Sequence, residues 1–284
     1  VYPYGQRFAP ARDGNALLFF LDAPFGETDL GTQLNAMLLS PTGEIIRFPV
    51  RVSTARTAHY DILPNGDGSV QVVWSGGPIA EPNLTIAQVD ALARPRAGAQ
   101  IAQAADWPAI VRSNDGVTRL FWLSAVDATV RRGILNGEAL SSPVTLMPSP
   151  PLFDADLLLG FDAALDRTHV YLFWTIERAD RSVETWLASA PLDADELPDA
   201  WMDPQRLGVV PSEAPFVTGF NGGDAQFAIQ GMDWVRYAVP LTGQFDLLPV
   251  VAQWQDSLAM VYLRGGEVVA LQSIAELDAD LIGF

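Results

Sequence analysis

The sequence of 284 residues contains no cysteine, no lysine and only two histidines, His59 and His169. The absence of cysteine excludes disulfides, thiol catalysis and Cys-ligated zinc. The absence of lysine excludes Schiff-base chemistry, and two histidines nearly exclude a Ser-His-Asp triad or a multi-histidine metal site. All 17 basic residues are arginines, against 34 acids, which gives a net charge of −17. Such a surface repels phosphate backbones, so we expect no nucleic-acid partner.

Long apolar runs are also absent. None approaches the roughly 20 residues that span a bilayer, so the sequence predicts no membrane span, and no segment reads as a signal peptide. The chain begins with Val1 and not Met, which leaves open that it is a mature or excised piece. Because 49% of the residues are hydrophobic and only 18% are charged, the composition excludes disorder for most of the length. We expect an extracellular, cell-surface or periplasmic protein.

A repeat of about 48 residues organises the chain. Each copy has a short apolar run, a turn of Gly, Asn and Asp, and a second apolar run that ends near an aromatic residue. The clearest copies are HYDILPNGDGSVQVVWSG at 59–76, DWPAIVRSNDGVTRLFWLS at 106–124 and DLLLGFDAALDRTHVYLFWT at 156–175. Trp74, Trp122 and Trp174 follow one another at intervals of 48 and 52 residues. Six such copies nearly fill the sequence.

The runs are five to eight residues long and rich in β-branched and aromatic residues, which is typical of strands. A third and a fourth run follow in most copies. Four antiparallel strands in 40 to 50 residues correspond to one β-propeller blade. The sequence therefore predicts a single all-β domain, a β-propeller of six four-stranded antiparallel blades, with five or seven blades as alternatives. The expected blades span 7–53, 58–101, 106–148, 153–210, 213–246 and 247–284, the last closed by residues 1–5, with 281–284 as the alternative closing strand.

One unit, PAIVRSNDGVTRLFWLSA followed by VRRGILNGEALSSPVTL, resembles the repeat of sialidase-like propellers of the BNR or Asp-box type. The resemblance implies the propeller fold. The family's Asp-box reads S-x-D-x-G-x-T-W, whereas here Ser113, Asn114, Asp115 and Gly116 lack the intervening residue. No spacing gathers the three arginines of a working sialidase, so the resemblance implies a non-catalytic member.

The Gly-rich turns, such as Asn65-Gly66-Asp67-Gly68, are typical of tight hairpins, because Gly and Asn tolerate a positive φ. Their oxygen atoms also suit Ca²⁺, which is the one cofactor that we leave open; otherwise we expect neither a cofactor nor a metal. The recurring aromatics Phe20, Trp74, Trp122 and Trp174 are flanked by apolar residues, so we expect them to pack between blades rather than to line a sugar site.

Acidic residues precede or begin several of the predicted first strands. In propellers these segments reach the mouth of the central channel, where the acids form either solvated loops or a site that uses carboxylates. The candidate catalytic residues are Asp106, Asp156 and Glu213. The candidate binding residues are His59, Tyr60, Asp61, Trp107, Asp154, Trp186 and Trp201.

Rigid blades that hold variable loops suit a binding surface. We therefore expect a non-enzymatic binding or scaffolding propeller that mediates protein–protein interaction through the segment 176–206. The alternatives are a carbohydrate-active enzyme, similar to glycoside hydrolases, that uses carboxylates at the channel mouth, and a lectin-like sugar-binding module. A protein is the expected partner and a carbohydrate the second candidate.

Overall fold

The computed structural model describes residues 4–283 except 23–31, 79–80, 114, 142, 166–167, 181, 211–216, 220–226, 231–234, 242–243, 248–259, 265–266 and 272–281. Burial is described from Gln6 to Arg206, again without these gaps and without 183 and 185. The chain forms two compact units, residues 1–112 with 117–145, and residues 113–116 with 146–284.

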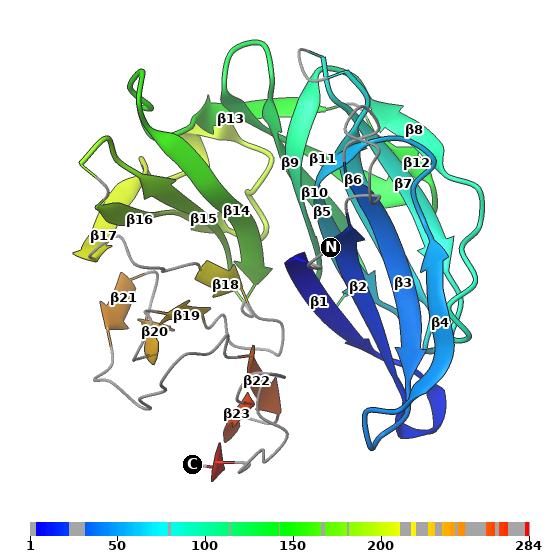
Figure 1. Cartoon of the computed structure of the whole chain (residues 1–284). Helices are drawn as coiled ribbons and strands as arrows, with labels where there is room; N and C mark the ends of the chain where they lie inside the picture. Colours follow the sequence, from blue (N-terminus) through cyan, green and yellow to red (C-terminus); the bar gives the residue numbers. More distant parts are fainter. Residues whose placement is uncertain are drawn as a thin grey trace. The chain divides into compact units, whose positions relative to one another are not determined.

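The first unit contains three antiparallel sheets in which each strand pairs with the next along the chain, with one exception in the third sheet (Figure 1). The first sheet consists of β1 (Tyr4–Pro10), β2 (Ala16–Asp22), β3 (Gln33–Leu39) and β4 (Ile45–Arg51). The second consists of β5 (Thr57–Pro64), β6 (Val70–Gly76), β7 (Asn83–Val89) and β8 (Ala99–Ala102). The third consists of β9 (Ala105–Arg112), β10 (Thr118–Ser124), β11 (Thr129–Asn136), β12 (Ala139–Leu140) and β13 (Val144–Pro148), which pairs with β11.

The second unit continues the same pattern. Its first sheet consists of β14 (Leu157–Leu165), β15 (His169–Glu177), β16 (Val183–Pro191) and β17 (Gln205–Val210). The next consists of β18 (Val217–Gly219), β19 (Phe227–Gln230), β20 (Val235–Leu241) and β21 (Gln244–Leu247). The last consists of β22 (Met260–Arg264), β23 (Glu267–Leu271) and β24 (Ile282–Gly283). The helical residues among those described form two short 3-10 turns, η1 (Arg12–Gly14) and η2 (Pro198–Ala200). No helix in the described part of the chain is long and apolar enough to cross a membrane.

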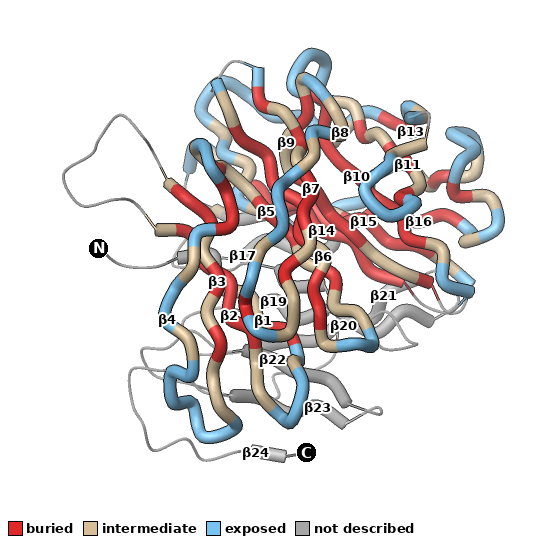
Figure 2. Tube along the Cα trace, turned by 90° about the vertical axis from the view of Figure 1, so that its right-hand side faces the viewer, coloured by how far each residue is buried: buried red, intermediate tan, exposed pale blue. Residues whose placement is uncertain are grey.

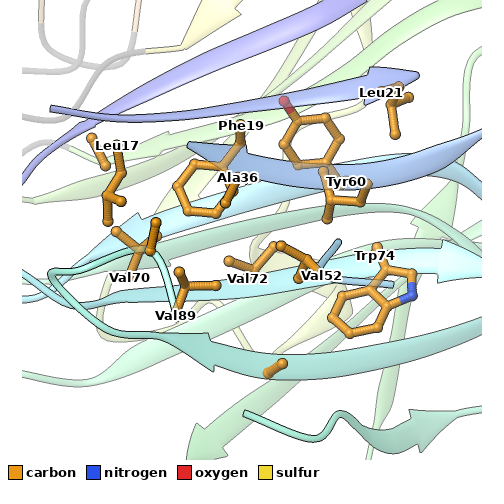
Figure 3. Close-up of a cluster of buried hydrophobic side chains, with 14 of the residues drawn as sticks. Leu17, Phe19, Leu21, Ala36, Val52, Tyr60, Val70, Val72, Trp74 and Val89 are labelled. Carbon is orange, nitrogen blue, oxygen red and sulfur yellow. The ribbon is translucent and has the colours of Figure 1, made fainter. Parts of the chain in front are cut away.

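The second sheet is apolar on both faces, and this explains why the sheets stack. On β6, Val70, Val72 and Trp74 pack against Leu17 and Phe19 of the first sheet (Figure 3). Val73, which points to the opposite face, packs in a second cluster with Leu120 and Trp122 of the third sheet. A sheet that is buried on both faces needs a neighbour on each side, which is the arrangement of propeller blades.

The recurring aromatic residues are buried, as the sequence predicts. Trp74 packs in the cluster shared with the preceding sheet, and Trp122 does the same one repeat later. In the second unit, Trp174 lies in β15, whose residues Val170 to Ile176 are all buried (Figure 2). Phe20 is also buried but belongs to the face of β2 that points away from the second sheet.

The molecule is therefore an all-β protein of the β-propeller class, and four of its six antiparallel sheets in the described residues are four-stranded. Its blade number stays a prediction. Tyr4 pairs with Leu21 in the first sheet. The third strand of the last sheet comes from the C-terminal end, where Ile282 pairs with Ala270, and closure of that blade by residues 1–5 stays a prediction.

The Gly-rich turn at Asn65–Gly68 is a hairpin, as predicted. The turn after β5 joins it to its antiparallel partner β6, and Gly68 has a φ of 80°. The carboxylate of Asp67 accepts hydrogen bonds from the amide and the hydroxyl of Ser69 at 2.9 and 2.6 Å. These contacts shape the turn itself. Among the described residues no group of three or more His, Asp or Glu side chains is placed to hold a metal ion, so the structure adds no support for Ca²⁺.

Candidate functional site

Three predicted site residues lie together where β5 and β9 begin. Nδ1 of His59, on β5, lies 2.8 Å from Oδ1 of Asp106, on β9. The ring of Trp107 stacks on the His59 ring with centroids 3.4 Å apart and an interplanar angle of 18°. The sequence separates His59 from this pair by a whole blade, and the stacking of the second and third sheets brings them into contact.

A serine that the sequence analysis missed completes the cluster. Ser75, on β6, lies opposite His59 in the antiparallel pairing. Its hydroxyl accepts a hydrogen bond from the His59 amide at 3.2 Å and donates one to Oδ1 of Asp106. Because Ser75 follows Trp74 in the repeat, it could be placed on the second strand from the sequence, but its pairing with His59 depends on the register of the hairpin.

Trp107 owes its position to an irregularity in β9. Asp106 lies opposite Leu123 and Ala109 lies opposite Phe121, so that Trp107 and Pro108 together face the single residue Trp122. This is a β-bulge, which re-aims side chains and is common beside active sites. Trp107 also has a φ of 52°, a left-handed conformation that is uncommon for a large side chain. Backbone strain of this kind concentrates at functional sites.

Asp106 is held as an ionised acceptor. Its Oδ1 accepts hydrogen bonds from His59, from Ser75 and from the amide of Trp107 at 2.8 Å. Burial on its own would raise the pKa of this carboxyl, but the hydrogen bonds from His59, Ser75 and Trp107 outweigh burial and lower the pKa. Asp106 is therefore suited to orient a partner rather than to donate a proton.

His59 has one ring nitrogen available. Because an ionised carboxylate only accepts hydrogen bonds, Nδ1 carries the proton that points to Asp106. Within the described part of the chain, Nε2 makes no hydrogen bond, and the side chain is 30% exposed. A histidine whose Nδ1 is held by a carboxylate and whose Nε2 is open is the usual arrangement of a general base.

Asp61, two residues further along β5, has a different role. It is 4% exposed. Its Oδ1 pairs with Nη1 of Arg7 at 3.0 Å, and its Oδ2 accepts the amide of Ile110 at 2.7 Å. The carboxylate thus connects the first strands of three consecutive sheets, β1, β5 and β9. We assign Asp61 to the framework of the site.

Two of the aromatic candidates lie in the interior. Tyr60 belongs to the cluster between the first and second sheets (Figure 3), and burial raises the pKa of its hydroxyl. Trp201 is 8% exposed, and its indole donates to the carbonyl of Asp195 at 3.0 Å. Both side chains are buried, so neither presents a surface to a ligand in the described structure.

The second unit holds the remaining candidates. Asp156 is a partner of Arg178 at 2.6 Å, with a side chain that is 3% exposed, so it is no free catalytic acid. Trp186 is partly exposed and donates to Oε2 of Glu184 at 2.9 Å. Asp154 is exposed in the loop before β14. Glu213 lies outside the described residues. Among the predicted acids that the structure describes, Asp61 and Asp156 are held in ion pairs with arginines, whereas Asp106 belongs to the cluster with His59.

No protein-family model and no curated protein matches this sequence. Solved structures do match. They include a PL25 polysaccharide lyase, an ulvan lyase, bound to -[GlcA(1-4)Rha3S]- (12% identity, 100% of this chain and 86% of that chain, TM-score 0.53). They also include the GH43_1 enzyme from Xanthomonas citri complexed with xylotriose (11% identity, 87% of this chain and 90% of that chain, TM-score 0.56). A third is an exo-β-1,3-galactanase from Clostridium thermocellum (9% identity, 100% of this chain and 73% of that chain, TM-score 0.57).

At these identities the likeness establishes the fold. It supports the propeller that the sialidase resemblance implied, but it does not support the sialidase type. The neighbours are enzymes that act on carbohydrates, and this contradicts the prediction of a non-enzymatic scaffold for protein partners. That prediction was wrong because a repeat pattern describes the blades and carries no information on turnover. The alternative, a carbohydrate-active enzyme, is the one that agrees with the comparisons.

Proposed function

We propose that this protein is a carbohydrate-active enzyme that cleaves a polysaccharide by elimination, with His59 as its proton-transfer group. The observation that carries the proposal is the hydrogen bond of 2.8 Å between His59 Nδ1 and Asp106 Oδ1. This bond fixes the tautomer in which Nε2 is the basic nitrogen. The similarity in fold to polysaccharide lyases and glycosidases supports the class of substrate.

The contacts of the two carboxylates near His59, those of Asp61 and Asp106, favour elimination over hydrolysis. A glycosidase needs two carboxyl groups that flank the bond, one of them a proton donor. In the described part of the site, Asp61 is buried against Arg7 and the Ile110 amide, and Asp106 has a lowered pKa. Neither is placed to give up a proton. A lone base of the histidine type suits removal of a proton next to a carboxylate instead.

In such an elimination from a uronate, the base removes the proton on C5, the bond from C4 to the glycosidic oxygen breaks, and a C4–C5 double bond forms. Nε2 of His59 takes up the C5 proton, and the resulting imidazolium can return a proton to the leaving oxygen. Asp106 stabilises that imidazolium, as the buried acid does in other His-Asp pairs. Trp107 holds the ring in one orientation, which is part of the geometric requirement for proton transfer.

An anionic substrate is compatible with the charges that surround His59. Asp61 is neutralised by Arg7, and the charge of Asp106 is offset by three hydrogen-bond donors. The net charge of −17 is therefore not concentrated as free carboxylates at this point of the described structure. Because polymers do not cross membranes, we also propose an extracellular, cell-surface or periplasmic location.

The test is an assay of the full chain on uronate polymers (polygalacturonate, glucuronan and ulvan) and on neutral xylan, arabinan and β-1,3-galactan. Elimination produces an unsaturated sugar that absorbs in the ultraviolet, whereas hydrolysis produces reducing ends without it. We expect the unsaturated product from at least one uronate polymer. His59→Ala should lower kcat by about 100- to 10,000-fold, the usual contribution of general base catalysis.

The control is the only other histidine. His169 lies at the start of β15 in the other compact unit, so His169→Ala should retain wild-type kcat. Cleavage that yields reducing ends alone would replace elimination by hydrolysis. Full activity of His59→Ala, or no cleavage of any polymer, would contradict the proposal.

A further inference from the structure

A second group of side chains, in the second unit, has the features of a ligand platform. Arg178, which follows β15, lies between two aromatic rings. Its guanidinium carbon is 5.7 Å from the centroid of Phe153 and 5.9 Å from that of Trp186. Both distances are within the range of cation–π contact. The guanidinium thus holds the two rings at fixed positions.

Arg178 is itself fixed by a dense set of polar contacts. Its Nε donates to Oε2 of Glu184 at 2.7 Å, and Nη2 pairs with the same oxygen. Nη1 donates to Oδ2 of Asp156 at 2.6 Å and to the carbonyl of Pro151 at 2.9 Å. The side chains of Arg178, Glu184 and Asp156 are 14%, 10% and 3% exposed. Hydrogen bonds between ions in a poorly solvated place are strong and directional.

This network remains charged over the ordinary pH range. A backbone hydrogen bond from Phe153 and the contacts with Arg178 lower the pKa of Asp156, although its partial burial opposes them. Burial tends to raise the pKa of Glu184, but bonds from Arg178, Arg206 and Trp186 lower it overall. Groups that stay ionised in mutual contact do not transfer protons. Their effect here is to hold neighbouring side chains in place.

The aromatic surface above this network is open. Phe153 is 68% exposed although one face of its ring lies on Arg178. Leu152 beside it is 44% exposed. Trp186 lies opposite Arg206 across β16 and β17, and the side chain of Arg206 is 54% exposed while bonded to Oε1 of Glu184 at 3.0 Å. An exposed ring held by buried ions is preorganised for binding, because ordering it on contact requires little further loss of freedom.

We propose that Phe153, Trp186 and Arg206 form a glycan-binding platform, on which sugar rings stack while Arg206 pairs with a carboxylate or sulfate of the polymer. The choice of an anionic glycan rests on the proposed function, which supplies the substrate class. It also rests on the chemistry of the group, since flat aromatic faces suit sugar rings and a fork of guanidinium donors suits carboxylate or sulfate oxygens. The platform would hold the polymer and take no part in proton transfer.

The platform occupies the end of its sheet where β14 begins and β15 ends. His59 lies at the corresponding end of the second sheet, where β5 begins and β6 ends. Loops of this kind carry binding residues in rigid folds. The equivalence is one of topology.

The test is binding of ulvan, glucuronan and neutral arabinan to the full chain, measured by titration calorimetry. The His59→Ala background prevents turnover. We expect Phe153→Ala to weaken binding of an anionic polymer by about 3- to 10-fold, the range of one aromatic contact. Arg206→Ala should weaken the binding of the anionic polymers and leave the binding of arabinan unchanged. The matched control is Phe48→Ala, which removes an aromatic ring on β4 that is 75% exposed and should not change binding.

Thermal unfolding of each variant separates lost binding from lost folding. Because Phe153 is mostly exposed, its replacement by alanine should leave the midpoint of thermal unfolding nearly unchanged. Wild-type affinity in Phe153→Ala and Trp186→Leu, or no binding of any polymer by the chain, would overturn the platform. If these variants bind normally while His59→Ala abolishes cleavage, the platform fails and the proposed function stands. If they lose binding although no polymer is cleaved, the platform stands and the proposed function fails.

Discussion

Arg7 and Asp61 form an ion pair of 3.0 Å between equivalent positions of neighbouring blades. Arg7 lies opposite Phe19 on β2, and Asp61 lies opposite Val73 on β6, one residue before the recurring aromatic in each case. The pair, with the Ile110 amide as a third member, connects three first strands beneath His59. The geometry of the candidate site therefore depends on contacts between blades.

This pair yields the first prediction. Asp61→Asn should lower the free energy of unfolding by about 2 kcal/mol, because hydrogen bonds to a buried charged acceptor each contribute in that range. Chemical denaturation of the variant measures the loss. Asp154→Asn, which changes an exposed loop acid, is the control and should be neutral. A wild-type midpoint for Asp61→Asn would show that the contact between the blades contributes little.

The second prediction concerns Gly76, the residue after Ser75. A Cβ at this position would lie 2.3 Å from the carbonyl oxygen of Arg56, a backbone atom that cannot rotate away. Gly76→Ala should therefore cost about 3 kcal/mol of stability, the upper range for an overpacked site. At Gly66, in the turn between β5 and β6, an added Cβ meets nothing within 4 Å. Gly66→Ala should stay within about 0.5 kcal/mol of the parent protein. Equal midpoints for the two variants would contradict the packing described here.

The blades could be predicted from the sequence because each signal is local. A turn such as Asn65–Gly68 and the alternation around Trp74 fix a hairpin without reference to the rest of the chain. The candidate site required more, since His59 reaches Asp106 only through the stacking of two sheets and the bulge at Trp107. No propensity marks Ser75 as a partner of either residue.

The errors have physical causes too. The sequence could not decide which chain end supplies the closing strand, because the strand that extends the last sheet, Ile282–Gly283, is too short to show a periodic pattern. Asp156 has the composition of a catalytic acid, and only its distance of 2.6 Å from Arg178 shows it to be a structural partner. Tyr60 and its polar neighbour Asp61 are both buried, because the second sheet is covered on both faces, so strand alternation alone does not separate interior from exposed residues here.

The third prediction separates stability from activity at Trp107. At a φ of 52°, glycine is less strained than alanine by about 1 kcal/mol. Trp107→Gly should therefore be more stable than Trp107→Ala by that amount. Both variants lose the ring that stacks on His59, so both should lose activity on the polymer to a similar extent. Denaturation curves and kcat values for the two variants provide the test, and an alanine variant as stable as the glycine variant would argue against a left-handed backbone.

The fourth prediction concerns pH and the hydroxyl of Ser75. The hydrogen bonds from His59, Ser75 and Trp107 lower the pKa of Asp106 in the folded protein despite its burial. A carboxyl with a lowered folded pKa stabilises the protein above its unfolded pKa of about 3.9, and this contribution is lost as the pH falls through the folded value. Ser75→Ala removes one donor, so the pKa of Asp106 should rise toward its ordinary value. The protein should then lose about 1 kcal/mol of stability at neutral pH. Its free energy of unfolding should also fall less steeply with decreasing pH than that of the parent protein.

Carbon NMR of the Asp106 carboxyl measures the rise in its pKa, and denaturation between pH 3 and 7 measures the loss of stability. A purely steric change would not move these two quantities together. Ser40→Ala is the matched control, because Ser40 lies in the turn between β3 and β4 and bonds only to Thr42, Glu44 and Gly43 there. It should leave the titration of Asp106 unchanged. An unchanged pKa of Asp106 in Ser75→Ala would contradict the hydrogen bond from Ser75 to Asp106, and His59 would then depend on Asp106 and Trp107 alone for its orientation.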